Sequence, residues 1–141
     1  MSRPTILVTD IVDRTAEEAI GGGLRTFNEE QCGISDLRPL AVILNDPESG
    51  ETLGGAIGRT SLGLLFLDLF FVPRTLRRSG LGTKILRMFE DEGRRRGCRS
   101  AMLYTISFQA PEFYARNGWQ RFGEIPCDPP GTSRIFMTKQ L

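Results

Sequence analysis

The chain has no histidine among its 141 residues. Histidine activates the nucleophile in Ser-His-Asp and Cys-His sites, and its imidazole is a common ligand of zinc. Its absence excludes both kinds of nucleophile activation and the zinc sites that need imidazole. Any chemistry must therefore depend on carboxylates, tyrosine, backbone groups or a bound co-substrate, and we expect no metal site.

Cysteine is scarce as well. Its three positions, Cys32, Cys98 and Cys127, are scattered and include no Cys-x-x-Cys pair. An odd, scattered set is typical of free thiols in a reducing compartment. No apolar run reaches the roughly 18 residues of a membrane span, and the N-terminus lacks the long apolar core of a secretion signal. We therefore expect a cytoplasmic protein without a membrane partner.

Excess charge of either sign is also missing. The chain carries 18 basic and 17 acidic residues, a net charge of +1. The whole molecule thus has no strong attraction to nucleic acid or to anionic membranes. Its length suits one domain, and a 40% hydrophobic fraction is enough for a buried core. With no linker, repeat or low-complexity segment, the sequence predicts a single domain over residues 1–141.

Hydrophobic periodicity and turn residues predict an α/β (α+β) fold. The three glycines at 21–23 are expected to divide the first helical region into two short helices. Segments 53–60 and 64–72 are expected to form a hairpin, and the helix after them leads to a further strand, which gives a mixed, mostly antiparallel sheet. The predicted helices cover 14–31, 81–96 and 111–116, and the predicted strands cover 39–44, 53–60, 64–72, 101–105, 119–125 and 135–139.

The stretch Phe71–Lys84, FVPRTLRRSGLGTK, places a basic glycine turn between an apolar strand and the start of a helix. The first N–H groups of a helix lack internal partners and lie at the positive end of its dipole. Glycine lets an anion approach them closely. Residues 74–99 carry nine basic and three acidic side chains. The turn therefore indicates an anion site, whereas Arg94–Arg96 are predicted to lie on a solvated face of the helix.

Two familiar phosphate motifs do not fit this turn. A dinucleotide fingerprint needs a third glycine where the chain has Ile85, and Gly82-Thr83-Lys84 has the wrong order for a P-loop. The pattern is Arg-x-x-Gly-x-Gly after a strand that ends in Val-Pro. It resembles the central motif of the GNAT superfamily of acyl-CoA-dependent N-acetyltransferases. In that family this turn wraps the pyrophosphate of coenzyme A.

A second stretch, Ser107–Trp119, SFQAPEFYARNGW, resembles the family signature Asn-x-x-Ala-x-x-Phe/Leu-Tyr-x-x-x-Gly-Phe. Two positions depart from it: Ser107 stands where the family often has asparagine, and Trp119 where it usually has phenylalanine. The sequence of this stretch is similar to that of a subgroup of short bacterial members of the family. The positions that match are Ala110, Phe113, Tyr114 and Gly118.

The resemblance implies an enzyme that transfers an acetyl group from acetyl-CoA to a primary amine on a small molecule, by direct attack in a ternary complex. It implies Tyr114 as the general acid near the cofactor sulfur, and Asp68 as a base, water holder or anchor of the acceptor. The alternative for Tyr114 is a packed core tyrosine. The alternative for Asp68 is a carboxylate that is bonded to backbone or paired with Arg59. Since Asp68 is the single charge in an apolar central strand, we expect it to be buried. Regular pairing would place it on one face with Phe66, Phe70 and Val72, whereas a bulge, which the family often has here, would change that.

The resemblance also implies a splay between strands 64–72 and 101–105, with the pantetheine arm between them. The acceptor would lie near Phe27 and Asn28, expected between the first two helices, near Asp68 and near the loop 127–133. Dimers are common in the family, so a homodimer is an option. The residues implied in binding acetyl-CoA are Phe70, Phe71, Val72, Arg77, Arg78, Ser79, Gly80, Leu81, Gly82, Thr83, Ser107 and Tyr114.

Two other functions stay open on the sequence alone. A protein of this fold can bind acyl-CoA as a sensor or interaction module without useful catalysis, and the departure at Ser107 permits this. A nucleic-acid binder could use the basic stretch 74–99. The overall charge and the lack of interleaved exposed aromatic residues in that stretch argue against a nucleic-acid binder. We therefore expect no nucleic-acid partner.

Overall fold

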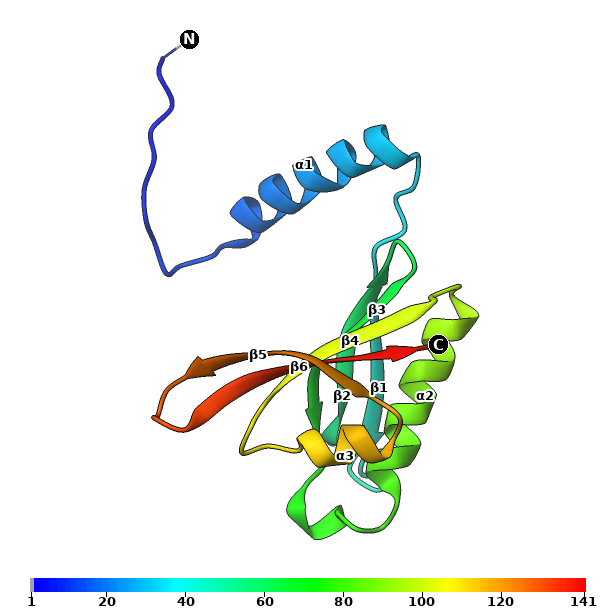
Figure 1. The fold of residues 1–141 in the computed structure, drawn as a ribbon. Coiled ribbons are helices and arrows are strands. Elements are labelled where there is room, and N and C mark those ends of the chain that lie inside the picture. Colours follow the sequence, from blue (N-terminus) through cyan, green and yellow to red (C-terminus); the bar gives the residue numbers. More distant parts are fainter. Residues whose placement is uncertain (1) are drawn as a thin grey trace. The chain divides into compact units, whose positions relative to one another are not determined.

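The computed structural model describes residues 2–141 (Figure 1). It divides into two compact units, one that ends at Ser35 and one from Asp36 to Leu141. The single domain over 1–141 stays a prediction. None of the helices in residues 2–141 is both long and apolar enough to cross a membrane. Cys32, Cys98 and Cys127 are free thiols, as predicted.

The first unit contains one continuous helix, α1 (Arg14–Cys32). Asp13 caps its start by accepting a hydrogen bond from the Ala16 N–H at 2.8 Å, and Gly33 closes its end in the left-handed conformation. The predicted break at glycines 21–23 is therefore wrong. Glycine lowers helix stability by about 1 kcal/mol per residue but keeps its N–H, so the helical hydrogen bonds continue through it, as they would not through proline.

The second unit is built on a six-stranded sheet in the order β1-β2-β3-β4-β6-β5. Every neighbouring pair is antiparallel except β3–β4, which is parallel. This confirms the mixed, mostly antiparallel sheet. The strands are β1 (Arg38–Asn45), β2 (Thr52–Ser61), β3 (Leu64–Phe71), β4 (Ser100–Ile106), β5 (Gln120–Cys127) and β6 (Thr132–Gln140), and the helices are η1 (Arg74–Leu76), α2 (Leu81–Arg95) and α3 (Pro111–Arg116).

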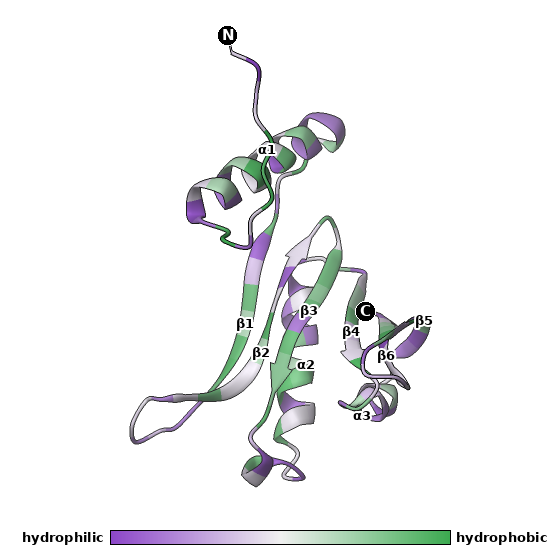
Figure 2. Ribbon diagram, turned by 90° about the vertical axis from the view of Figure 1, so that its left-hand side faces the viewer, coloured by the Kyte–Doolittle hydropathy of each residue, from purple (hydrophilic) through white to green (hydrophobic). Residues whose placement is uncertain are grey.

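The core lies between α2 and one face of this sheet. Ile85, Leu86 and Phe89 of α2 are buried against side chains of the central strands. Figure 2 shows that α2 carries both hydrophobic and hydrophilic residues, as expected for a helix with one face against a sheet. The strand residues that complete this core include Leu65, Leu67, Ala101, Leu103, Ile135 and Met137.

The parallel pair separates halfway along β3. Its ladder runs from Leu64 opposite Ser100 to Leu67 opposite Leu103, and the rest of β3 has no partner on β4. The splayed pair that the resemblance implied is thereby confirmed. The end of β3 therefore presents backbone groups that no β4 ladder satisfies.

A bulge on β3 corrects the prediction for Asp68. The β2 partner changes from Gly58, opposite Leu67, to Ile57, opposite Leu69, so Asp68 is the extra residue. Asp68 and Leu69 are both exposed, whereas Leu67 and Phe70 pack on the core side. The expected burial of Asp68 is wrong. The pairing is not regular, so the alternative with a bulge applies: the bulge shifts the alternation by one residue, and Asp68 does not share a face with Phe70 and Val72.

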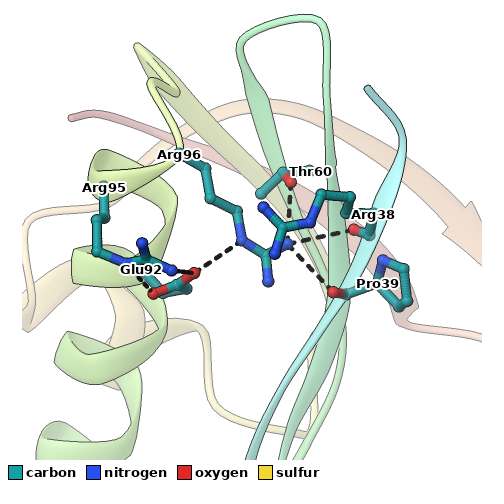
Figure 3. Close-up of polar contacts among 6 residues, drawn as sticks. All are labelled: Arg38, Pro39, Thr60, Glu92, Arg95 and Arg96. Carbon is teal, nitrogen blue, oxygen red and sulfur yellow. Dashed lines mark hydrogen bonds and ion pairs between the residues drawn. The ribbon is translucent and has the colours of Figure 1, made fainter. Parts of the chain in front are cut away.

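Arg96 connects the end of α2 to the first two strands (Figure 3). Its guanidinium donates to Glu92 at 2.8 Å, to the Pro39 carbonyl at 3.1 Å and to the Thr60 hydroxyl at 3.1 Å. With 11% of its side chain exposed, Arg96 does not belong to the predicted solvated face. Hydrogen bonds from Arg95 and then Arg96 lower the pKa of Glu92 to about 2.

A second polar cluster connects α2 to the last strand. The Glu90 side chain is 3% exposed and accepts hydrogen bonds from the Trp119 indole N–H at 3.1 Å and the Lys139 ammonium at 2.7 Å. The ammonium also donates to the Asn117 carbonyl at 2.8 Å. Tryptophan at 119 thus supplies a donor that phenylalanine lacks, which gives that departure from the family signature a structural reason.

Candidate active site

A cavity of about 660 Å³ lies where β3 and β4 diverge. Its volume falls within the range typical of small-molecule sites. Its walls come from the end of β3, the loop before α2, the end of β4 and α3. The lining residues are Phe70, Phe71, Val72, Arg77, Arg78, Gly80, Gly82, Thr83, Thr105, Phe108, Gln109, Ala110, Phe113, Tyr114 and Arg116.

One wall is the start of α2, which has no side-chain cap. Gly80 is the N-cap in the left-handed conformation, at φ +83°, and makes no capping hydrogen bond through a side chain. The Lys84 N–H bonds to the Gly80 carbonyl at 3.1 Å. The N–H groups from Leu81 to Thr83 precede that first turn, so they have no acceptor within the helix. This wall therefore presents free donors at the positive end of a 15-residue helix.

The charge on the cavity wall has one sign. Arg77, Arg78 and Arg116 line it, and none of the lining residues in the described part of the chain is acidic. Arg77 is held in place because its Nε donates to the Val72 carbonyl at 2.8 Å. Arg78 has φ +65°, a conformation that costs a non-glycine residue on the order of 1 kcal/mol and that often occurs at binding sites. The wall suits an anionic ligand.

Tyr114 lies at the apolar end of the cavity. It is 7% exposed, and its ring contacts those of Phe70, Phe113 and Trp119 at centroid distances of 6.1, 5.3 and 6.1 Å. Every polar side-chain atom that is fully buried in residues 2–141 has a hydrogen-bond partner. The Tyr114 hydroxyl has no partner among these residues, so it is not fully buried and opens into the cavity that Tyr114 lines. Burial raises its pKa to about 12. The group is therefore a protonated hydrogen-bond donor at neutral pH.

Asp68 is exposed on the β3 bulge and does not line the cavity. The alternative in which it pairs with Arg59 is not observed, because the Arg59 guanidinium lies over the Phe66 ring, 4.5 Å from its centroid. Within residues 2–141 no salt bridge or side-chain hydrogen bond involves Asp68. Its carboxylate is thus available to a ligand on the exposed side of the bulge.

Of the residues implied in binding acetyl-CoA, most line the cavity, and Ser79, Leu81 and Ser107 do not. The Ser79 hydroxyl donates to the Leu76 carbonyl at 2.6 Å. Ser107 joins β4 to β6, because its hydroxyl accepts from the Ser133 N–H at 3.0 Å. Phe27 and Asn28 lie inside the continuous α1 of the first unit, so their expected place between two helices is wrong.

Several cavity residues were not among the predicted site residues. Ala110 and Phe113 belong to the second motif, which was a signal for them. No signal in the sequence indicated Gln109. Its side-chain oxygen accepts hydrogen bonds from the Thr105 hydroxyl at 3.1 Å and the Ile106 N–H at 2.9 Å, which fixes the turn after β4. Arg116 joins the cavity through its place at the end of α3. No metal-type cluster of three or more acidic or cysteine side chains occurs in the part of the chain that the structure describes.

Comparison with known proteins gives a consistent result. A family model described as the Acetyltransferase (GNAT) family matches residues 9–119. Acetyltransferase Atu2258 of Agrobacterium fabrum is 34% identical over 135 residues, which are 96% of this chain and 98% of that protein. Blasticidin-S acetyltransferase of Streptomyces morookaense is 34% identical over 130 residues, covering 84% of this chain and 96% of that one.

Solved structures share the same fold. A crystal structure of a protein from Agrobacterium tumefaciens, described as an acetyltransferase, has a TM-score of 0.88 at 32% identity and covers 98% of this chain and 100% of its own. An acetyltransferase from Bacillus cereus has a TM-score of 0.76 at 27% identity, over 96% of this chain and 98% of its own.

Proposed function

Because the chain belongs to the GNAT family and is an acyltransferase, we propose that it transfers an acetyl group from acetyl-CoA to a primary amine on a small molecule. The observation that carries this proposal is the uncapped start of α2 in a cavity that three arginines also line. A diphosphate has the charge and the acceptor oxygens that this wall can bind. Coenzyme A carries such a diphosphate at the base of a long thiol-bearing arm.

The splay between β3 and β4 is proposed to hold that arm. The backbone of Phe70 and Phe71 is free of a β4 ladder, so it can pair with the amides of the arm. The Val72 carbonyl already accepts from Arg77 at 2.8 Å. We therefore assign Val72 to the cavity wall and to holding Arg77 beside the diphosphate.

The reaction forms a nitrogen–carbon bond and breaks the carbon–sulfur bond of the thioester. An alkyl ammonium titrates near pH 10.4 and a thiol near 8.5, so the amine loses a proton to water or to Asp68 before or during attack. Tyr114 donates a hydrogen bond to the sulfur as thiolate character develops. Since the pKa of Tyr114 is raised to about 12, it keeps its own proton in the resting site and stabilises the leaving group. The displaced thiolate then takes a proton from solvent.

A small-molecule acceptor is supported by one relative, whose name specifies blasticidin S. We place Asp68 on the acceptor side because its carboxylate is exposed at the splay. A cytoplasmic location is proposed from the three free thiols. A homodimer and the absence of a nucleic-acid partner stay predictions.

Isothermal titration with CoA and a thiol-release assay on a panel of amines test the proposal together. We expect saturable binding of CoA and release of free thiol from acetyl-CoA that depends on the amine. No binding at millimolar CoA would end the proposal. Binding without thiol release from any amine would favour the sensor or interaction module instead.

A further inference from the structure

We infer that Trp119, which Glu90 of α2 holds in place, is a positioning residue for Tyr114 in the proposed reaction. This role rests on the proposed function, because Trp119 affects turnover only through the Tyr114 hydroxyl. Trp119 itself does not line the cavity, so it is not a catalytic residue. It belongs, with Glu90 and Tyr114, to the unit of residues 36–141, and all three are buried there.

Trp119 is fixed through both its side chain and its backbone. The indole N–H donates to Glu90 Oε2 at 3.1 Å, and the backbone N–H donates to the Tyr114 carbonyl at 3.0 Å. Trp119 is 3% exposed. An indole has a single polar group, and rotation of this buried ring would leave its N–H without a partner, which costs free energy. The ring is therefore held in one orientation.

Glu90 is itself anchored without help from Trp119. Its other carboxylate oxygen, Oε1, accepts from the Lys139 ammonium at 2.7 Å, and the same ammonium donates to the Asn117 carbonyl at 2.8 Å. Arg94 adds a longer ion-pair contact to Oε1 at 3.8 Å. Hydrogen bonds to an ionised group are roughly twice as strong as neutral ones. One oxygen of Glu90 thus connects α2 to β6, and the other connects it to Trp119.

Tyr114 is surrounded by three aromatic rings, each at a steep angle to its own ring. The interplanar angles are 71° with Phe70, 70° with Phe113 and 68° with Trp119, which is the edge-to-face arrangement that aromatic pairs favour. Phe70 and Phe113 also line the cavity, whereas Trp119 does not. Trp119 therefore supports the Tyr114 ring from the protein interior, and a shift of the indole would move the hydroxyl at the cavity.

The helix α2 connects this support to the wall proposed for the diphosphate. Gly80 is at its start, and Glu90 lies about 15 Å further along, at a rise of about 1.5 Å per residue. One rigid element thus sets the place of the donor and, through Glu90 and Trp119, the place of Tyr114. A misplacement of about 1 Å can cost about 100-fold in rate. Disturbing Trp119 should therefore lower kcat and leave donor binding at the start of α2 unchanged.

A double-mutant cycle tests this role with the full chain, acetyl-CoA and the best amine of the panel. Trp119→Phe keeps an aromatic ring but removes the N–H that Glu90 accepts. We expect kcat to fall about tenfold, with KM for acetyl-CoA and Kd for CoA within about twofold of the unaltered chain. In the Tyr114→Phe background the same change should lower kcat by less than about twofold, because two residues that act through one hydroxyl do not have additive effects.

Matched variants on α2 separate positioning from a loss of stability. Glu90→Gln removes the charge and keeps the size, so kcat should fall as it does in the tryptophan variant. Glu92→Gln is the control, because it makes the same change at a residue whose partners, Arg95 and Arg96, do not line the cavity. It should lower stability and leave kcat unchanged. Met88→Leu, an exposed change on the same helix, controls for handling.

A measurement without ligand tests the contact with Glu90 itself. Trp119 is the single tryptophan of the chain, so its indole N–H gives one signal in NMR. We expect this N–H to exchange slowly with solvent in the unaltered, CoA-free chain. In Glu90→Gln it should exchange at least about tenfold faster, because its buried acceptor is weakened.

Four results would overturn the role of Trp119: a kcat of Trp119→Phe within about twofold of the unaltered chain, an equal loss of kcat in both backgrounds, a loss of CoA affinity as large as the loss of kcat, or an indole N–H that exchanges as fast as an exposed one. Loss of turnover in Tyr114→Phe with full turnover in Trp119→Phe would refute Trp119 alone. Full turnover in Tyr114→Phe would refute the assignment of Tyr114 as well. No thiol release by the unaltered chain would instead refute the proposed function.

Discussion

Replacing Tyr114 with phenylalanine removes the hydroxyl that we assign to the leaving sulfur. The ring stays, together with its contacts to Phe70, Phe113 and Trp119 at 5.3–6.1 Å. Because the hydroxyl bonds to no other group in residues 2–141, its removal leaves no protein donor or acceptor unsatisfied. We expect the free energy of unfolding to change by less than about 1 kcal/mol. The affinity for CoA should also stay close to that of the unaltered chain.

Turnover should fall much more. A hydrogen-bond donor aimed at developing negative charge in a site that excludes water contributes about 10²- to 10³-fold to kcat, or roughly 3–4 kcal/mol. The Tyr114→Phe variant should lose this factor with little change in KM for acetyl-CoA. Since burial raises the pKa of Tyr114 to about 12, the hydroxyl should keep its proton as pH rises to about 10. No alkaline loss of kcat due to this group is expected below that pH.

The thiol-release assay measures kcat, and isothermal titration measures CoA affinity on the same preparations. A variant with kcat within threefold of the unaltered chain would refute the assignment of Tyr114 to the leaving group. A large loss of CoA affinity would instead mean that the hydroxyl binds the donor in the ground state. Met88→Leu serves again as a control for handling and stability.

Three other predictions follow from the structure. Gly80→Glu places a side chain at φ +83° and a negative charge at the start of α2, so the Kd for CoA in titration should rise at least about tenfold; Gly97→Glu, at φ +86° beyond the other end of α2, should leave it unchanged. Glu90→Ala leaves Lys139 unpaired and should cost about 3–5 kcal/mol in chemical denaturation. Folding lowers the pKa of Glu92 from 4.5 to about 2, so its stabilisation is present above pH 4.5 and is lost as pH falls toward 2; the difference in unfolding free energy between the unaltered chain and Glu92→Gln should shrink over that range.

The sequence predicts the part of the site that depends on local chemistry. A strand, a basic turn with Gly80 and a helix start occur within one short stretch, and their order determines where the free N–H groups lie. The structure places this turn on the cavity wall together with Tyr114. These residues are close in sequence or belong to a recognisable motif, so single-sequence reasoning reaches them.

Features that depend on pairing between distant segments escape such reasoning. Asp68 was expected to be buried because its strand is apolar, but a bulge set by the pairing of β2 with β3 turns it outward. Arg96 was expected on a solvated face, but two of its partners, Pro39 and Thr60, are more than 30 residues away in sequence. The cavity role of Gln109 depends on the turn that it makes with Thr105, which no periodicity indicates.

A crystal structure of the chain with CoA would show whether the start of α2 binds the diphosphate of coenzyme A. We expect diphosphate oxygens roughly 2.7–3.2 Å from the backbone nitrogens of Gly82 and Thr83, with Arg77 or Arg78 beside them. A diphosphate bound elsewhere, with those N–H groups hydrogen-bonded to water, would refute this binding site.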